Sequence, residues 1–520
     1  MPLFLGTIIM SISLQDNYDQ LLAKYREMTV LRTAGDIIYW DMETKMPAKG
    51  LELRSEQLSQ ISLMTHRMVT DPKVGAHLDA IEKDSKLSSL TPEQRRNVHL
   101  MRKAFDEESK LPDALVAEMS KQQILAVGAW KKAKEARNFA MYRADLQKNI
   151  ELKKQAAEIL MKAKGTRTPY DALLDMFEPG MTAQRIDEVF NSMKNGLIKI
   201  MKKVEASPNK PDQAILSKKV SVEAQRKISA MAMDFIGYET SGPNAWGRLD
   251  ETEHPFSNGY YTDVRITTHY YEDNFKSSLF SVLHEGGHAL YEGDLPLQWM
   301  YQPIGSAASY GIHESQSRFV ENMVGRSPEF ISYMLPKLRE FTGEALAGTT
   351  LDEFTRAVNA AQPSKIRIEA DEVTYGLHII VRFELERDIF ADKITVDELP
   401  QAWNEKYSKY LGVDIEHDSE GIMQDTHWAG GSFGYFPSYA LGNIYGGMFL
   451  RKLDKDVPTW MASVQKGDFM PVRKWLVDNI YSKGNLYDPA DLVKVVTGEG
   501  LTIEPFLAYL NEKVDRTYGA

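Results

Sequence analysis

The sequence of 520 residues contains no cysteine. Disulfide bonds, thiol catalysis and thiolate coordination are therefore excluded, and any bound metal must be held by nitrogen and oxygen ligands. An excess of positive charge is also missing, since 62 Lys and Arg oppose 73 Asp and Glu, for a formal net charge of −11. A nucleic-acid partner requires a basic surface, so we expect none.

Long hydrophobic runs are absent as well. The first ten residues, MPLFLGTIIM, are apolar but too short to span a membrane, and they lack a basic start and a small-residue cleavage site. We therefore expect no membrane partner and a cytoplasmic location. Met10 is the expected natural start, and the segment before it is expected to be disordered or a misassigned extension. Residues 1–13 are assigned to a disordered extension and residues 14–520 to a helical domain.

A metal-binding pattern stands out in FSVLHEGGHALYE. It places His284, Glu285 and His288 at the spacing of a zinc peptidase helix. Residues i and i+4 of a helix lie on one face, so both imidazoles can reach one metal while Glu285 takes a proton from a bound water. The alternative is a chance helical HxxxH without a metal.

Two glycines, Gly286 and Gly287, lie inside this predicted zinc helix. Each weakens a helix by up to about 1 kcal/mol relative to alanine. We therefore expect the helix to be held by its surroundings, or to be approached closely by another backbone.

A catalytic zinc usually takes three protein ligands, so a third must be found. Glu314 in GIHESQSRF follows His288 by 26 residues, far enough for a second helix to fold back against the first. We favour Glu314 because a His2Glu set is typical of hydrolytic zinc sites. The neighbouring His313 is the alternative ligand, and an ion pair with Arg318 is the structural alternative for Glu314.

Five short segments are together typical of one family. They are DVRIT (263–267), HEGGH (284–288), HESQS (313–317), IRIEAD (366–371) and GIMQDTHW (421–428). The chain resembles the carboxypeptidase Taq family of metallocarboxypeptidases, and IIYWDMETKMPAKG at 37–50 extends the resemblance toward the N-terminus.

The resemblance implies a mainly α fold: a large helical single-domain peptidase with a deep substrate cleft and a small antiparallel sheet beside the zinc helix. It also implies a homodimer that releases single C-terminal amino acids from peptides with a free C-terminal carboxylate. Zinc is the expected metal, one per chain, although nitrogen and oxygen ligands also suit cobalt or manganese.

Local patterns agree with a helical fold. In the first 240 residues apolar side chains recur at spacings of three and four, with breaks at 207–212 and 241–247. Thr91, Thr350 and Thr395 have the sequence of capping residues at helix starts. Residues 421–443 are rich in glycine and aromatics, which indicates an ordered loop.

In the segment 259–275, β-branched and aromatic residues alternate with polar ones at every second position. This pattern predicts a β-strand. Asp263, Arg265, Thr267 and His269 would share one face, and the strand edge would pair with an extended peptide. A short structural hairpin is the alternative. The resemblance implies that Asp263 and Arg265 line the substrate cleft and limit which part of a peptide enters.

A carboxypeptidase needs a cation that binds the terminal carboxylate. Arg367 is the candidate, because a guanidinium matches a carboxylate with two parallel hydrogen bonds. Its spacing predicts one helical face shared with Asp371, Tyr375 and His378. An internal ion pair with Asp371 is the alternative, with His378 as a core residue.

The predicted reaction follows from these residues. A divalent metal on His284, His288 and Glu314 would activate a water, and Glu285 would pass the proton to the leaving amine. His427 and one of Tyr435 and Tyr439 would donate to the oxyanion, although the aromatic side chains of this loop can equally serve packing.

Two rival functions differ from this one. A dipeptidyl carboxypeptidase or oligopeptidase on a similar helical scaffold would share the metal site but lack the clamp for a single C-terminal residue. A non-enzymatic helical interaction protein would bind no metal and cleave no peptide.

Overall fold

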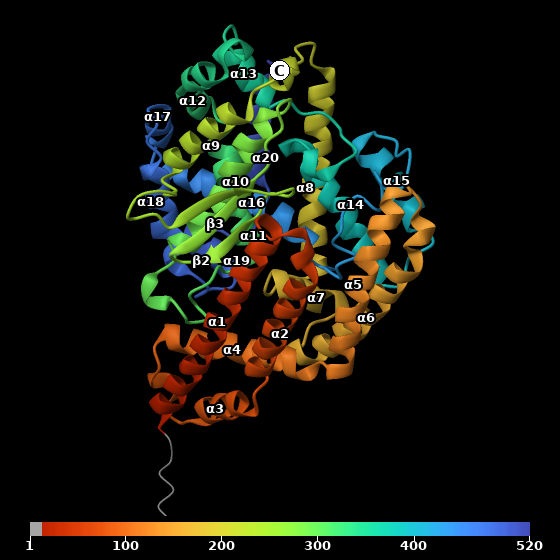
Figure 1. The fold of residues 1–520 in the computed structure, drawn as a ribbon, viewed down its shortest axis with the longest axis vertical. Helices are drawn as coiled ribbons and strands as arrows, with labels where there is room; N and C mark the ends of the chain where they lie inside the picture. The colour runs from red at the N-terminus through yellow and green to blue at the C-terminus, as the bar shows by residue number, and fades with distance from the viewer. Residues whose placement is uncertain (1–12, 520) are drawn as a thin grey trace, which may run out of the picture. The chain divides into compact units, whose positions relative to one another are not determined.

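The computed structural model describes residues 13–519, so the extension expected at the N-terminus lies outside the described residues except for Ser13, which caps the first helix. Contacts between Cα atoms divide the chain into two compact units. Figure 1 shows the fold, coloured by residue number from red at the N-terminus to blue at the C-terminus. The single domain expected from residue 14 stays a prediction. Among residues 13–519, no helix is both long and apolar enough to cross a membrane.

Of the described residues, the first unit comprises 13–110 together with Leu297–Ser306. Its helices are α1 (Leu14–Thr44), α2 (Leu51–Val69), α3 (Pro72–Lys83) and α4 (Pro92–Lys110). Buried Asn97 fixes the 297–306 segment, because its amide donates to Gln302 Oε1 (2.8 Å) and accepts from the Ile304 N–H (3.0 Å). Thr91 and Gln94 form the predicted capping contacts at the start of α4.

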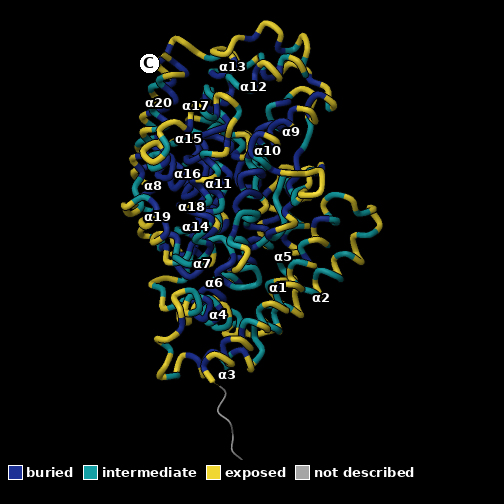
Figure 2. Tube along the Cα trace, turned by 90° about the vertical axis from the view of Figure 1, so that its left-hand side faces the viewer, coloured by how far each residue is buried: buried dark blue, intermediate teal, exposed yellow. Residues whose placement is uncertain are grey.

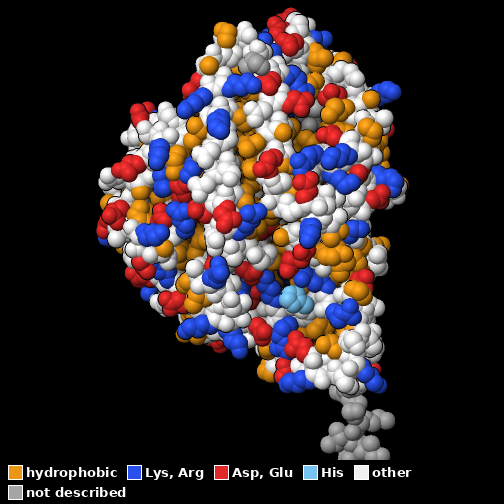
Figure 3. Space-filling view, turned by 180° about the vertical axis from the view of Figure 1, so that it is seen from behind, with side chains coloured by type: hydrophobic (Ala, Val, Ile, Leu, Met, Phe, Trp, Pro, Cys, Tyr) orange, Lys and Arg blue, Asp and Glu red, His pale blue; other side chains and the backbone are white. Residues whose placement is uncertain are grey.

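The second unit contains the remaining residues and most of the buried chain (Figure 2). Its helices are α5 (Asp113–Glu135), α6 (Arg143–Lys164), α7 (Pro169–Phe177), α8 (Ala183–Ala206), α9 (Val222–Ile236), α10 (Phe275–Gly293), α11 (Tyr310–Arg318), α12 (Pro328–Thr342), α13 (Leu351–Val358), α14 (Glu372–Phe390), α15 (Leu399–Leu411), α16 (Phe436–Asp456), α17 (Trp460–Gln465), α18 (Met470–Asn479), α19 (Pro489–Thr497) and α20 (Glu504–Tyr518). The mainly α class is thus confirmed. Acidic and basic side chains are interspersed on the face in Figure 3.

Helix starts follow the predicted capping residues in part. Thr350 and Glu353 form the capping box of α13. Thr395 also contacts Glu398, but α15 begins only at Leu399, so this pair closes the turn before the helix rather than capping it. The sequence pattern located the turn correctly and the helix start three residues too early.

A three-stranded sheet consists of β1 (Gly247–Glu251), β2 (Ser257–Tyr260) and β3 (Asp263–Thr268) in the order β1-β3-β2. It is mixed, since β1 pairs parallel and β2 antiparallel with β3, which corrects the predicted antiparallel sheet. The segment predicted as one strand at 259–275 instead contributes to a hairpin, in which β2 and β3 are joined by a turn at Tyr261. Because β3 is central, its edges are both paired, and the predicted pairing of this strand with a peptide is wrong.

Helices α10 and α11 touch at Gly287. A Cβ atom built on Gly287 would lie 2.5 Å from the Gln316 carbonyl oxygen and 2.7 Å from Ser317 Cα. Helix α16 also lies close to α11, since a Cβ on Gly442 of α16 would lie 2.8 Å from Glu314 Cβ. The close approach of a second backbone, one of the two explanations expected for the glycines, is therefore present.

Helix α16 corrects the predicted loop at 421–443. The loop ends at Tyr435, and α16 begins at Phe436 with Pro437 in its first turn, where proline is tolerated. Its glycines serve packing: besides Gly442, a Cβ on Gly447 would lie 2.7 Å from Phe506 Cα. Composition therefore suggested a loop where tight helix packing requires small residues.

We predict that Gly287→Ala destabilises the fold by about 1 to 3 kcal/mol, because the added methyl group overlaps the α11 backbone. Gly128→Ala is the matched control, since Gly128 lies within α5 and its Cβ would meet nothing within 4 Å. That variant should gain roughly 0.5 to 1 kcal/mol. Urea unfolding of both variants measures the difference, and equal effects would contradict the packing argument.

Candidate functional site

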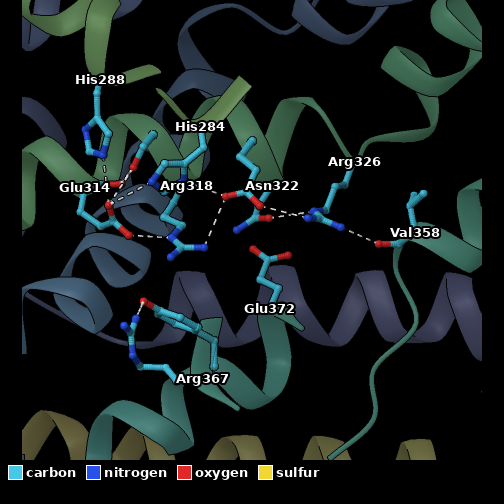
Figure 4. Close-up of polar contacts among 12 residues, drawn as sticks. His284, His288, Glu314, Arg318, Asn322, Arg326, Val358, Arg367 and Glu372 are labelled. Atoms are coloured by element: carbon cyan, nitrogen blue, oxygen red, sulfur yellow. Dashed lines mark hydrogen bonds and ion pairs between the residues drawn. The ribbon is translucent and has the colours of Figure 1, made fainter. Parts of the chain in front are cut away.

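Three potential metal ligands gather between α10 and α11. His284, His288 and Glu314 each offer one ligand atom, and these atoms lie within 4.8 Å of one another. Glu314 Oε2 is 3.6 Å from His284 Nε2 and 3.4 Å from His288 Nε2. Figure 4 shows the three side chains converging. The sequence-predicted ligand set is thus brought together.

The second nitrogen of His288 faces His313. Nδ1 of His288 contacts Nδ1 of His313, whose Nε2 lies 2.8 Å from Glu292 Oε1. The carboxylate accepts a hydrogen bond from the Nε2–H of His313, whose Nδ1 can then accept a hydrogen bond from the Nδ1–H of His288, so that His288 Nε2 is deprotonated. His313, the alternative ligand, therefore lies behind His288 and outside the ligand group.

Glu314 forms the ion pair with Arg318 as well as facing the histidines. Arg318 Nε donates to Oε1 (2.7 Å), whereas Oε2 faces the imidazoles and accepts from Ser317 Oγ (3.0 Å). The two readings of Glu314 are compatible because a carboxylate has two oxygens. Burial alone would raise the pKa of Glu314, but Arg318 and His284 together hold the pKa well below its usual range.

This donor set fits a divalent metal. Two neutral imidazole nitrogens and one ionised carboxylate oxygen form a typical hydrolytic zinc set. His284 Nδ1 lies 2.9 Å from Glu321 Oε2, so both histidines have their Nδ1 engaged and their Nε2 directed at Glu314. Partners of this kind orient metal-ligating histidines in proteins.

Glu285 is buried beside the ligand group, with 7% of its surface exposed. Burial raises its pKa to about 7, and a hydrogen bond with Ser257 of β2 opposes this shift. A carboxyl group with such a pKa can accept and return a proton near neutral pH.

Arg367 does not share a helical face with Asp371, and this prediction is wrong. It lies in a short 3-10 turn, η8 (Arg367–Glu369), whereas Asp371 caps α14. Its Nη2 donates to Asp425 Oδ1 (2.8 Å) and its Nη1 to Tyr375 OH (3.0 Å). The partner of Arg367 is therefore 58 residues away in sequence, where helical spacing could not reveal it.

Asp425 lies between two buried arginines. Arg382 Nε donates to Asp425 Oδ2 (2.7 Å), while Arg367 binds Oδ1. These three side chains carry one net positive charge, which suits an incoming carboxylate. His378 is fully buried and contacts Tyr407 OH (2.9 Å), so it is a core residue.

The predicted oxyanion donors lie together. His427 Nε2 is 3.2 Å from Tyr439 OH, and the ring centroids of Tyr435 and Tyr439 are 5.1 Å apart. Burial lowers the pKa of His427 to about 4. Its buried Nδ1 has no hydrogen-bond partner among the described residues. Trp428, Phe433 and Phe436 are buried packing residues.

Asp263 and Arg265 pair with each other on β3. Arg265 donates from Nε and Nη2 to the two carboxylate oxygens of Asp263, both at 2.7 Å. The same strand contacts the metal-binding helix, since Thr268 Oγ1 lies 2.6 Å from Ser281 Oγ of α10. His269 lies beyond the end of β3 and contacts the Thr252 carbonyl.

Sequence reasoning missed three side chains that contact the site. Glu292 follows His288 by four residues and Glu321 follows Glu314 by seven, so helical spacing placed both on the relevant faces. Ser257 had no local signal, because its contact with Glu285 depends on how β2 packs against α10.

The helical fold and the His-His-Glu group beside Glu285 define a metallopeptidase of the HExxH type. Residues 20–514 match the family Carboxypeptidase Taq (M32) metallopeptidase. Thermostable carboxypeptidase 1 of Thermus thermophilus is 39% identical over 509 residues, covering 96% of this chain and 99% of the relative. Carboxypeptidase 1 of Bacillus subtilis is 38% identical over 483 residues, covering 93% and 95%.

Solved structures agree with the sequence relatives. The crystal structure of the M32 carboxypeptidase from Deinococcus radiodurans R1 superposes with a TM-score of 0.92 at 34% identity, covering 97% of this chain and 100% of that one. The chain therefore belongs to the carboxypeptidase Taq (M32) family. It is a metallocarboxypeptidase, a peptide hydrolase that removes C-terminal residues.

We predict that Glu314→Ala loses most of its metal, because a catalytic site of this type has only three protein ligands. His313→Ala should retain more metal, since His313 contacts only the rear of His288. Metal analysis after dialysis measures both variants. A loss confined to the histidine variant would mean that His313 is the third ligand.

Proposed function

We propose that the enzyme releases single C-terminal amino acids with one zinc ion held by His284, His288 and Glu314. The observation that carries this proposal is the convergence of these ligand atoms within 4.8 Å beside a buried Glu285. When bound there, zinc supplies Lewis-acid polarisation of the peptide carbonyl and lowers the pKa of a water.

Glu285 is the proposed general base and acid. It takes the proton of the attacking water and returns it to the leaving amine. Support comes from its position in the zinc helix and from a pKa of about 7 caused by burial. Ser257 of the edge strand β2 contacts this carboxyl group and opposes the rise of its pKa.

Arg367 is the proposed clamp for the terminal carboxylate. The excess positive charge of the Arg367, Arg382 and Asp425 cluster supports this role. Tyr375 connects the clamp with the ligand region, because it accepts a hydrogen bond from Arg367 while its ring lies 4.4 Å from the Arg318 guanidinium. We propose that Asp263 and Arg265 line the substrate cleft and limit which part of the peptide can enter it.

His427 and the two tyrosines are the proposed donors to the oxyanion. His427 is neutral near pH 7, because its pKa is about 4. The neutral ring can donate from one nitrogen only. Tyr435 and Tyr439 lie close enough to Glu314 for its charge to add to burial in raising their pKa values, so both stay protonated donors.

A homodimer in the cytoplasm completes the proposal. The dimer rests on what is usual in the family, and the compartment is supported by the absence of cysteine. Light scattering of the purified chain tests the assembly directly.

We predict that Glu285→Gln keeps its metal but hydrolyses peptides about 10² to 10⁴ times more slowly, because glutamine preserves shape without accepting a proton. Metal content and the hydrolysis rate of an amino-blocked peptide are measured on the same preparation. Wild-type activity in a fully metallated variant would refute the base assignment.

We predict that Arg367→Ala sharply reduces cleavage of free-acid peptides and removes their preference over C-terminal amides. Arg367→Lys should restore little, because a point charge cannot form the bidentate contact. Mass spectrometry of peptide digests follows both substrates and records whether residues leave singly or in pairs.

Arg473→Ala is the matched control for this measurement. Arg473 also pairs bidentately with an aspartate, Asp294, at 2.8 Å for both contacts, and its loss should leave the acid-to-amide ratio intact. If Arg367→Ala leaves that ratio intact too, another residue reads the terminus, and Arg265 is the next to test.

A further inference from the structure

We propose that Glu321 is a positioning residue for the metal ligand His284, and that Arg326 and Arg318 hold Glu321 in place. This inference rests on the proposed ligand set. It assigns a function to a carboxylate that is not one of the proposed ligands and lies outside the HEGGH and HESQS segments.

The contact with His284 has the geometry that this role requires. Glu321 Oε2 lies 2.9 Å from His284 Nδ1, and the carboxylate is the hydrogen-bond acceptor, so Nδ1 carries the proton. Nε2 is then deprotonated and directed toward Glu314. A hydrogen bond to a carboxylate also raises the basicity of an imidazole ligand. Glu321 therefore fixes the tautomer and the ring orientation of His284.

Two arginines hold the Glu321 carboxylate. Arg326 Nη2 donates to Oε1 (3.0 Å), and Arg318 Nη1 donates to Oε2 (3.3 Å). Because Arg318 also binds Glu314, charges of alternating sign run from Arg326 through Glu321 and Arg318 to Glu314. The charges of these four side chains sum to zero, so the arginines compensate the buried carboxylates before any metal binds.

Arg326 is itself fixed on several sides. Its Nε donates to Asn322 Oδ1 and its Nη1 to the Val358 carbonyl, both at 2.9 Å. The guanidinium also lies 3.8 Å from the centre of the Phe280 ring of α10. These contacts use each of its nitrogens, so Arg326 presents Nη2 to Glu321 in one orientation.

The backbone that carries Glu321 is unusual. Residues Phe319–Val324 form a π-helical turn, η6, directly after α11, and such turns are frequent at functional sites. The turn ends at Gly325, where a Cβ would lie 2.6 Å from Leu283 Cδ1 of α10. Glycine thus lets the turn lie against the metal-binding helix, which places Glu321 behind His284.

The test measures zinc affinity rather than activity. Chelator competition gives the zinc dissociation constant of the wild type, Glu321→Gln, Arg326→Gln and the double variant. We expect Glu321→Gln to weaken zinc binding about 10- to 100-fold. Arg326→Gln should have a smaller effect, and the double variant should be no weaker than Glu321→Gln alone, because Arg326 acts through Glu321. Circular dichroism and Tm of the metal-free proteins verify folding.

Glu384→Gln is the matched control. Glu384 is also a buried carboxylate between two cations, Lys194 and Lys406, both at 2.6 Å, but it contacts none of the proposed ligands. Its variant should lower Tm and leave zinc affinity unchanged. Equal zinc affinity in Glu321→Gln and the wild type, or equal weakening in Glu384→Gln, would overturn the inference.

His284→Ala separates this inference from the ligand assignment. If His284→Ala loses zinc and Glu321→Gln does not, the ligand set stands and the positioning role is wrong. If His284→Ala retains wild-type affinity, the ligand set itself is wrong and the inference fails with it.

Discussion

The metal centre depends on the contact between two helix backbones at Gly287. Glu314 can reach the two histidines only if α11 lies directly against α10, and any side chain at Gly287 would meet the α11 backbone first. Gly442 of α16 permits a similarly close approach of a second helix to Glu314. Glu314 is thus positioned by the packing of two helices against α11, and this packing is rigid because protein interiors are close-packed.

Buried charge is the second constraint on this region. Removing a carboxylate from water costs several kcal/mol unless opposite charge and hydrogen bonds compensate it. Glu314 and Glu321 share Arg318, and Asp425 is shared by Arg367 and Arg382. With Arg326, which also pairs with Glu321, the first group is neutral and lies at the proposed metal ligands, whereas the second keeps one positive charge. The positive charge of the second group matches an anionic peptide terminus.

The contacts that the sequence predicted correctly are those between residues close in sequence. The four-residue spacing of the two histidines predicted a metal-binding helix, which is α10, and the separation of Glu314 from His288 allowed a second helix, α11, to return. The predictions for Arg367 and for the 421–443 segment were wrong in part. Arg367 pairs with a distant aspartate, and the glycines of α16 admit neighbouring helices rather than forming a loop.

The sequence by itself determined the chemical nature of the site: that its candidate ligands are nitrogen and oxygen donors, which glutamate accompanies the two histidines, and that thiolates take no part. Tertiary structure alone decided that Glu314 rather than His313 joins the ligand group, that β3 is a central strand, and that Glu321 contacts His284. The physical reason is the sequence separation over which a local pattern can fix a contact. Helical spacing fixes neighbours within a few residues, whereas contacts between elements depend on how their surfaces pack, and no local pattern encodes that geometry.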